Sequence, residues 1–326
     1  MTASPTYAKK VRWFDVQRRN DACTLVARAP RLDALVGDLV DAFSLDFGTP
    51  CNQDCGYCSI EKYPVHTVSE GDMLKVAATG VSLGLRRATL IGGEPTIHKS
   101  LFDRLRKFRA IGVEEFVLCT NGLMLSYPDF LARLVEHPVT VLGLSVDDFR
   151  EEGQNALTRN PNNFRLLMQA LENLGRGPLP FRHIYFYSVL TRANPDVRGY
   201  LEFYERHPVG APRTYLFSRL KPVANAWRNR ADLHVSPEAL VPHIAAGIDW
   251  AEAHGASVGL RNFPRCMLGE RYERYDLDRY AWEMSYDVEA RRYVRDQQST
   301  EHMDFADRCR PCPWASDCHG LFKNEL

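Results

Sequence analysis

Three cysteines in one short segment are the side chains of this sequence best suited to chemistry. The segment TPCNQDCGYCSIEKY places Cys51, Cys55 and Cys58 in a CxxxCxxC pattern. A loop this short can wrap a single metal centre, and three thiolates can hold three irons of a 4Fe-4S cluster while the fourth iron stays open to an outside ligand. Structural zinc, the alternative, normally takes four protein ligands, often from paired CxxC turns that this segment lacks. The spacing therefore favours an iron-sulfur cluster with one open iron.

Glycines and polar residues follow three apolar segments further along the chain. Gly92, Gly93 and Glu94 come after RRATLI, Asn121 comes after EEFVLCT, and Ser145 ends VTVLGLS. Glycine has no β-carbon, so another group can lie close against the backbone there, and Glu94 adds a carboxylate. Each motif alone is ordinary, because glycine and Asn-Gly make turns and serine caps helices. Together with the cysteines upstream, they indicate a binding site.

These motifs resemble the radical S-adenosylmethionine (SAM) superfamily. The resemblance rests on the cysteine triad, on Tyr57 directly before its last cysteine, and on the Gly-Gly-Glu-Pro segment after the second strand, and it spans residues 43–225. It implies that the open iron binds the amino and carboxylate groups of SAM. Reductive cleavage of SAM would then give a 5′-deoxyadenosyl radical that removes hydrogen from the substrate. The implied cofactors are a 4Fe-4S cluster and SAM.

The resemblance also implies roles for single residues. Glu94 would contact the SAM amino group, whereas Arg159 matches a family arginine only loosely. The cofactor-binding residues implied are Tyr57, Gly92, Gly93, Glu94, Asn121, Ser145 and Arg159. No catalytic side chain is identified. Cys119 is a candidate hydrogen-atom donor beside the Thr-Asn-Gly turn, although free cysteines in strands are mostly small buried hydrophobes.

A second group of cysteines lies near the C-terminus. Cys309, Cys312 and Cys318 form a CxxCx5C pattern, and Cys266 lies well upstream. Four thiolates complete a cluster without an open iron, which suits electron relay, structural support or substrate placement. The tail resembles the auxiliary-cluster (SPASM or Twitch-like) branch of the family and predicts one auxiliary 4Fe-4S cluster. The alternative is a structural zinc on the same four cysteines.

The tail also resembles that of peptide-modifying maturases, so the leading hypothesis is hydrogen abstraction from a peptide or protein, for crosslinking or epimerisation. Only a short extension precedes Cys51, and a separate recognition protein would then supply peptide binding. The alternative is a dehydrogenase or epimerase acting on a small molecule such as a sugar, aminocyclitol or nucleoside. A zinc-binding interaction protein is the remote alternative. The electron donor would be a flavodoxin or ferredoxin.

Bulk composition restricts the other partners. Lysine plus arginine equals aspartate plus glutamate at 41 each, so no strong field favours nucleic acid or an anionic membrane. No apolar stretch has the length of a signal peptide or membrane span, which predicts a cytoplasmic protein.

The elements that must position these residues alternate along the chain. From Phe43 onward, six short apolar segments follow one another, most separated by amphipathic helical patterns. This repetition predicts an α/β fold, a partial (β/α)6 TIM-type barrel with its chemistry at the C-terminal strand ends. We expect an N-terminal extension over 1–42, the barrel over 43–228, and a cysteine-rich auxiliary-cluster region over 229–326.

Overall fold

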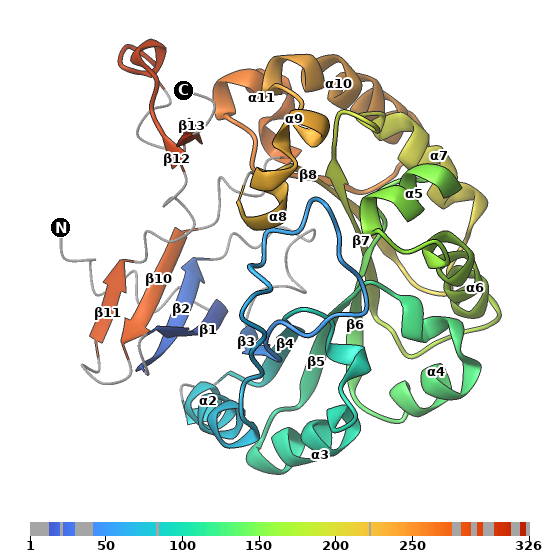
Figure 1. The fold of residues 1–326 in the computed structure, drawn as a ribbon, viewed down its shortest axis with the longest axis vertical. Helices are drawn as coiled ribbons and strands as arrows, with labels where there is room; N and C mark the ends of the chain where they lie inside the picture. The colour runs from blue at the N-terminus through green and yellow to red at the C-terminus, as the bar shows by residue number, and fades with distance from the viewer. Residues whose placement is uncertain are drawn as a thin grey trace.

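The fold is built on a parallel sheet surrounded by helices (Figure 1). This is a computed structural model, and the residues that it describes are 13–19, 22–29, 42–82, 85–221, 223–275, 282–287, 292–295, 303–313 and 320–323. Neighbouring strands from β3 to β9 all pair in parallel. These strands are β3 (Ala42–Asp46), β4 (Arg87–Ile91), β5 (Glu115–Thr120), β6 (Val139–Ser145), β7 (His183–Leu190), β8 (Arg213–Arg219) and β9 (Val258–Arg261).

Helices form the outer layer of the barrel (Figure 1). The main ones are α2 (Glu70–Ser82), α3 (Leu101–Ile111), α4 (Pro128–Leu134), α5 (Glu151–Thr158), α6 (Asn163–Gly175), α7 (Val197–Arg206), α10 (Pro237–His254) and α11 (Arg265–Tyr272). Their starts follow local signals. Ser236 accepts a hydrogen bond from the Ala239 amide at the start of α10, and Asp196 accepts one from the Gly199 amide at the start of α7.

Side chains alternate between the two faces of the sheet, as the period of a strand requires. Phe116 and Leu118 belong to the large apolar core, which is formed with the helices. Val117, between them, packs with Val141, Tyr185 and Leu216 in a separate small cluster on the opposite, inner face. The inner face therefore has an apolar floor, and residues two positions further along each strand lie above it.

The sheet has one parallel strand more than the six that the sequence predicts. The six expected strands are present, and β9 adds a seventh beside β8 through pairs such as Ser218 with Arg261. The sheet thus continues past residue 228, while the division of the chain into domains stays a prediction. On the other side of β3, the sheet order continues through β1 (Trp13–Arg19), β2 (Ala22–Ala29), β10 (Trp282–Asp287) and β11 (Arg292–Arg295).

The C-terminal segment packs against the end of strand β8. A two-stranded ladder joins β12 (Met303–Asp304) to β13 (Leu321–Phe322). The Phe322 ring is buried, and the Arg219 guanidinium lies 4.2 Å from its centroid. This cation–π contact with a desolvated arginine fixes the last described strand against the barrel. None of the helices that the structure describes is long and apolar enough to cross a membrane.

Candidate functional site

The cysteine loop starts directly after β3 and is joined to the end of β4. The Gly93 amide donates to the Gly48 carbonyl at 2.7 Å, and the Glu94 amide donates to the Pro50 carbonyl at 2.9 Å. A β-carbon on Gly93 would lie 2.2 Å from that Pro50 oxygen, and Gly92 has a φ of +134°. Glycine, which has no β-carbon, tolerates both the close approach at Gly93 and the positive φ at Gly92. The two glycines therefore let the β4 end pack against the segment that carries the first cysteine.

The three triad thiols fit the protein ligands of a cluster. Cys55 is buried, Cys51 and Cys58 are half-buried, and all three are free of disulfides. Burial raises the pKa of the Cys55 thiol to about 12 and also raises that of Cys51. Iron binding would replace these protons, because thiolates are the metal-bound form. Among the described residues, no three His, Cys, Asp or Glu side chains group around a single ion; a cluster instead distributes three thiolates over three irons.

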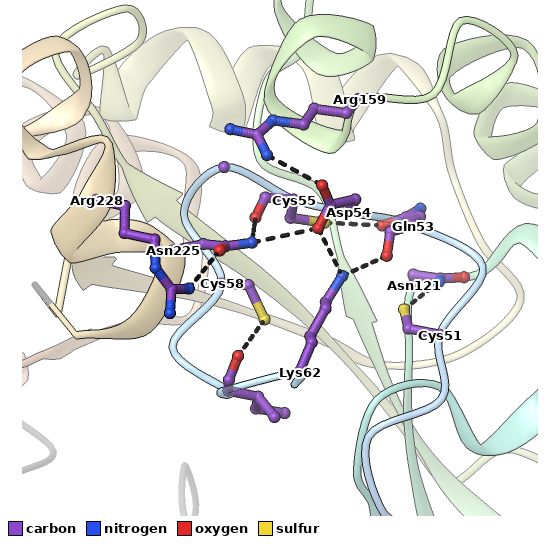
Figure 2. A network of polar contacts seen from close by, with 12 residues as sticks. Cys51, Gln53, Asp54, Cys55, Cys58, Lys62, Asn121, Arg159, Asn225 and Arg228 are labelled. Carbon is purple, nitrogen blue, oxygen red and sulfur yellow. Dashed lines mark hydrogen bonds and ion pairs between the residues drawn. The ribbon is translucent and has the colours of Figure 1, made fainter. Parts of the chain in front are cut away.

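Asp54 is the centre of a polar network that holds the cysteine loop from outside (Figure 2). Its carboxylate accepts from Arg159 Nη1 at 3.0 Å, from Asn225 Nδ2 at 3.3 Å and from Lys62 Nζ at 3.5 Å. Arg159, expected at the SAM site, instead pairs here with the carboxylate between two cysteines. It ends α5 with a φ of 52°, and this left-handed turn aims its side chain at the loop. Whether Arg159 also reaches SAM stays a prediction.

A short helix after β8 binds the backbone of the same loop. Asn225 Nδ2 donates to the Cys55 carbonyl at 3.2 Å, and Asn229 Nδ2 donates to the Gly56 carbonyl at 3.0 Å. Asn225 belongs to α8 (Ala224–Arg228), and Asn229 links it to α9 (Arg230–Leu233). The Ala226 amide completes the contact by donating to the Cys58 carbonyl at 3.3 Å. These contacts satisfy loop carbonyls that would otherwise need water.

Glu94 is buried and connects the ends of β4 and β5. Its carboxylate accepts from the Thr96 amide at 3.1 Å, from the Thr120 hydroxyl at 2.7 Å and from the Asn121 amide at 2.7 Å, and the Thr96 hydroxyl also donates to it. Only 1% of the residue is exposed. Burial raises the pKa of Glu94, and the hydrogen bonds oppose that shift. The side chain expected to bind the SAM amino group thus has four donors within the protein.

Tyr57 ties the cysteine loop to the end of β6. Its hydroxyl donates to the Asp147 carboxylate, and the Val189 amide donates to the same carboxylate at 3.1 Å. Burial raises the pKa of Asp147 to about 7, and the Tyr57 hydrogen bond opposes that shift. The tyrosine expected at the cofactor site therefore anchors the loop between Cys55 and Cys58.

The raised pKa of Asp147 predicts a pH-dependent stability. The folded protein holds this proton up to about pH 7, whereas the unfolded chain loses it near pH 3.8, so the Asp147 contribution to unfolding free energy falls as pH rises between these values. From pH 5 to 7 the loss is about 2–3 kcal/mol. Asp147→Asn should remove this pH dependence of the unfolding free energy, measured by urea unfolding of the metal-free protein. Asp129→Asn, at an exposed site on α4, is the control, and an unchanged pH slope in Asp147→Asn would contradict the expectation.

The remaining candidates lie at the strand ends or in the tail. Asn121 Nδ2 donates to Asn52 at 2.8 Å and lies 4.0 Å from Cys51 Sγ. Cys119 shares the inner face with Val117, since they are two residues apart on β5, and Ser145 occupies the inner face at the end of β6 by the same alternation. Their roles toward SAM or substrate stay predictions.

The structure describes three of the four C-terminal cysteines. Cys266 lies on α11 and is exposed, and Cys309 and Cys312 are half-buried in the tail. Cys318 lies outside the described residues. The auxiliary cluster therefore stays a prediction.

Comparison with known proteins identifies the part of the chain that carries this site. The model of the Radical SAM superfamily matches residues 46–201. This segment has the sequence pattern of a radical SAM domain. The matched segment contains the cysteine triad, Glu94, Tyr57 and Arg159, whereas α8 and α9 lie beyond it.

Curated relatives are similar to part of the chain. A GTP 3',8-cyclase of Geobacter sulfurreducens is 32% identical over 37% of this chain and 41% of its own length. A GTP 3',8-cyclase of Synechococcus elongatus is 28% identical over 49% of this chain and 50% of its own. The chain thus spans about half the length of the curated relatives that it matches.

Solved structures with a similar fold support the fold of the chain. The Streptococcus suis protein SuiB, crystallised with the precursor peptide SuiA, superposes with a TM-score of 0.54 at 12% identity, over 72% of this chain and 51% of SuiB. SuiB bound to S-adenosylmethionine superposes with a TM-score of 0.53. At this identity the likeness concerns the fold alone.

The relatives correct the function expected from the sequence. Both the peptide-modifying maturase and the alternative, a dehydrogenase or epimerase acting on a sugar, aminocyclitol or nucleoside, are wrong, because the curated relatives are GTP 3',8-cyclases. Their name describes ring closure on a nucleotide, a reaction type different from the expected oxidoreductase or maturase. The error has a physical origin: enzymes with many different substrates share this fold and these cysteine spacings, so neither feature specifies the substrate.

Sequence reasoning missed the side chains that hold the cysteine loop. Asp54 and Lys62 carry no motif, since charged loop residues are usually solvated. Asn225 and Asn229 lie four residues apart, which puts both on one side of a helical turn. That spacing was a usable signal, but nothing local indicated that this side contacts the loop at Cys55.

Proposed function

We propose that this chain is a radical SAM enzyme that acts on a purine nucleotide of the GTP type and closes a ring within it. The observation that carries the proposal is the similarity of part of this chain to curated GTP 3',8-cyclases, 32% identical over 37% of the chain in the Geobacter sulfurreducens case. The balanced overall charge does not oppose it, because a phosphate site needs only a few local cations.

In this function the triad would hold the 4Fe-4S cluster, which with SAM supplies an electron and a 5′-deoxyadenosyl radical. The chain's own contribution is placement. Tyr57 and the Asp54 network fix the loop over the strand ends, and Glu94 fixes the neighbouring ends of β4 and β5. The inner face beneath them, with Val117 and Tyr185 on its floor, would exclude water from the reacting part of the nucleotide.

Cys266, Cys309, Cys312 and Cys318 would hold a second, auxiliary 4Fe-4S cluster. The contact of Phe322 with Arg219 supports this, because it brings the cysteine-bearing tail to the C-terminal end of β8. A flavodoxin or ferredoxin would donate the electron. The proposal includes neither nucleic acid nor a membrane as a partner.

The test uses anaerobically reconstituted protein with SAM and dithionite, supplied with GTP, ATP, CTP or no nucleotide. Products are followed by liquid chromatography and mass spectrometry. We expect GTP to be consumed with formation of a new guanine-nucleotide product, and GTP deuterated on its ribose to transfer deuterium to 5′-deoxyadenosine. Formation of 5′-deoxyadenosine without any GTP consumption or deuterium transfer would retain the radical SAM activity and overturn the nucleotide substrate.

A further inference from the structure

Gln53 lies inside the cysteine loop, and half of its side-chain amide is unused. The side chain is buried, with 8% of the residue exposed. Its Oε1 accepts a hydrogen bond from Cys55 Sγ at 3.1 Å (Figure 2). Its Nε2 is buried too and has no hydrogen-bond partner among the described residues. A buried amide donor without a partner is costly, so its retention points to a partner that is present only in another state of the site.

The chemistry of Cys55 changes when it becomes a metal ligand. A thiol donates its hydrogen, which suits the carbonyl oxygen of Gln53, whereas a metal-bound cysteine is a thiolate and has no hydrogen to donate. The carbonyl oxygen would then face a negatively charged sulfur. The amide carries both an acceptor and a donor of similar size, and half a turn about its last torsion exchanges them. Nε2 would then occupy the position 3.1 Å from the sulfur.

We propose that Gln53 donates a hydrogen bond from Nε2 to the Cys55 thiolate in the cluster-bound protein, and so raises the reduction potential of the SAM-cleaving cluster. Hydrogen bonds to cysteine sulfurs favour the more negatively charged, reduced form of a cluster. Gln53 is thus a positioning residue that acts through Cys55. The inference rests on the cluster of the proposed function and is independent of the nucleotide substrate.

The surroundings keep the amide beside the sulfur. Lys62 Nζ donates to the Gln53 carbonyl, and Asn225 Nδ2 donates to the Cys55 carbonyl at 3.2 Å. Asp54, between these two residues, is held by Arg159. With the backbone fixed on both sides, rotation of the amide is a smaller change than withdrawal of the side chain. The Tyr57 hydroxyl also lies within hydrogen-bond reach of Cys55, but it donates to Asp147, so the Gln53 amide can add a donor to the sulfur.

The first experiment compares reduction potentials. Gln53→Met keeps the length of the side chain and removes the donor, and Gln169→Met, on the half-buried side of α6, is the matched control. In a background with Cys309 and Cys312 replaced by alanine, an EPR-monitored potentiometric titration follows the triad cluster alone. We expect Gln53→Met to retain iron and to reduce at a more negative potential. A tenfold loss of the reduced form at fixed potential corresponds to about 59 mV. The Gln169 variant should not shift.

A second experiment uses only the wild-type protein, so its result does not depend on the folding of a variant. Wild-type protein labelled with 15N at the side-chain amides of glutamine is reduced and studied by pulsed EPR. We expect a 15N coupling to the cluster that disappears in unlabelled protein. The proposal is overturned if labelled wild-type protein shows no such coupling, or if Gln53→Met retains the wild-type iron content and an unchanged potential. Loss of all iron in wild-type reconstitution would instead remove the proposed function itself.

Discussion

Replacement of Cys51, Cys55 and Cys58 by alanine is expected to abolish SAM cleavage and to lower the iron content from about eight to about four atoms per chain. The three thiols lie on one loop. Tyr57 ties this loop to the end of β6, and the Gly93 and Glu94 amides tie its start to the end of β4. No other described segment carries three cysteines this closely spaced. Without them the chain has no open iron for SAM. Iron analysis and quantification of 5′-deoxyadenosine in the reconstituted protein test both parts.

The matched control replaces Cys309 and Cys312 in place of the triad. That variant should keep about four irons and should still cleave SAM, because the triad is intact. If the triad variant formed 5′-deoxyadenosine at the wild-type rate, the SAM-cleaving site would lie elsewhere. If the control variant kept about eight irons, the tail would not be a cluster site.

The sheet was predictable from sequence because its signals are local. Strand β5, EFVLCT, is a short apolar run that is followed by Asn-Gly, and such runs with turn residues at their ends indicate buried parallel strands. The same holds for the other expected strands. Strand β9 is only four residues long, Val258–Arg261, and its neighbour in the sheet is set by tertiary packing. The six strands that the sequence predicts for the barrel do not include it.

The candidate site was predictable in its residue types and less so in their contacts. Tyr57, Glu94 and Arg159 were all expected to contact SAM, and in the structure each makes a contact that fixes the cysteine loop or the adjoining strand ends. Asn225, which donates a hydrogen bond to Asp54, lies 171 positions away in the sequence. No local sequence pattern can predict a contact over this separation. A family motif thus identifies residues expected near a cofactor. Which of them hold the cysteine loop in place depends on tertiary contacts that the motif does not show. The substrate is harder to predict from the sequence than these contacts, because the motifs describe cofactor binding.

Glu94→Ala is expected to destabilise the protein even without SAM or iron. The change removes the acceptor of two backbone amides, Thr96 N and Asn121 N, which are fixed by the chain and cannot turn toward another acceptor. A buried donor left unsatisfied costs about 1–3 kcal/mol, so the two amides together predict a loss on the order of 2–6 kcal/mol in unfolding free energy. Urea unfolding of the metal-free variant, followed by circular dichroism, measures it.

Thr120→Val is the matched control for the Glu94 variant. It removes one donor of the same carboxylate, at 2.7 Å, and the acceptor of one backbone amide, Gly122 N at 3.0 Å, and keeps the side-chain volume. Because one backbone amide loses its acceptor in place of two, the cost should be about half that of Glu94→Ala, on the order of 1–3 kcal/mol. In cluster-loaded protein, Glu94→Ala should also weaken SAM binding, because Asn121 and the cysteine loop both depend on the β4 end that Glu94 holds. A Glu94 variant as stable as the wild type would show that the four hydrogen bonds contribute little. Weakened SAM affinity with full stability would then return Glu94 to the direct contact with the SAM amino group that its sequence motif implies.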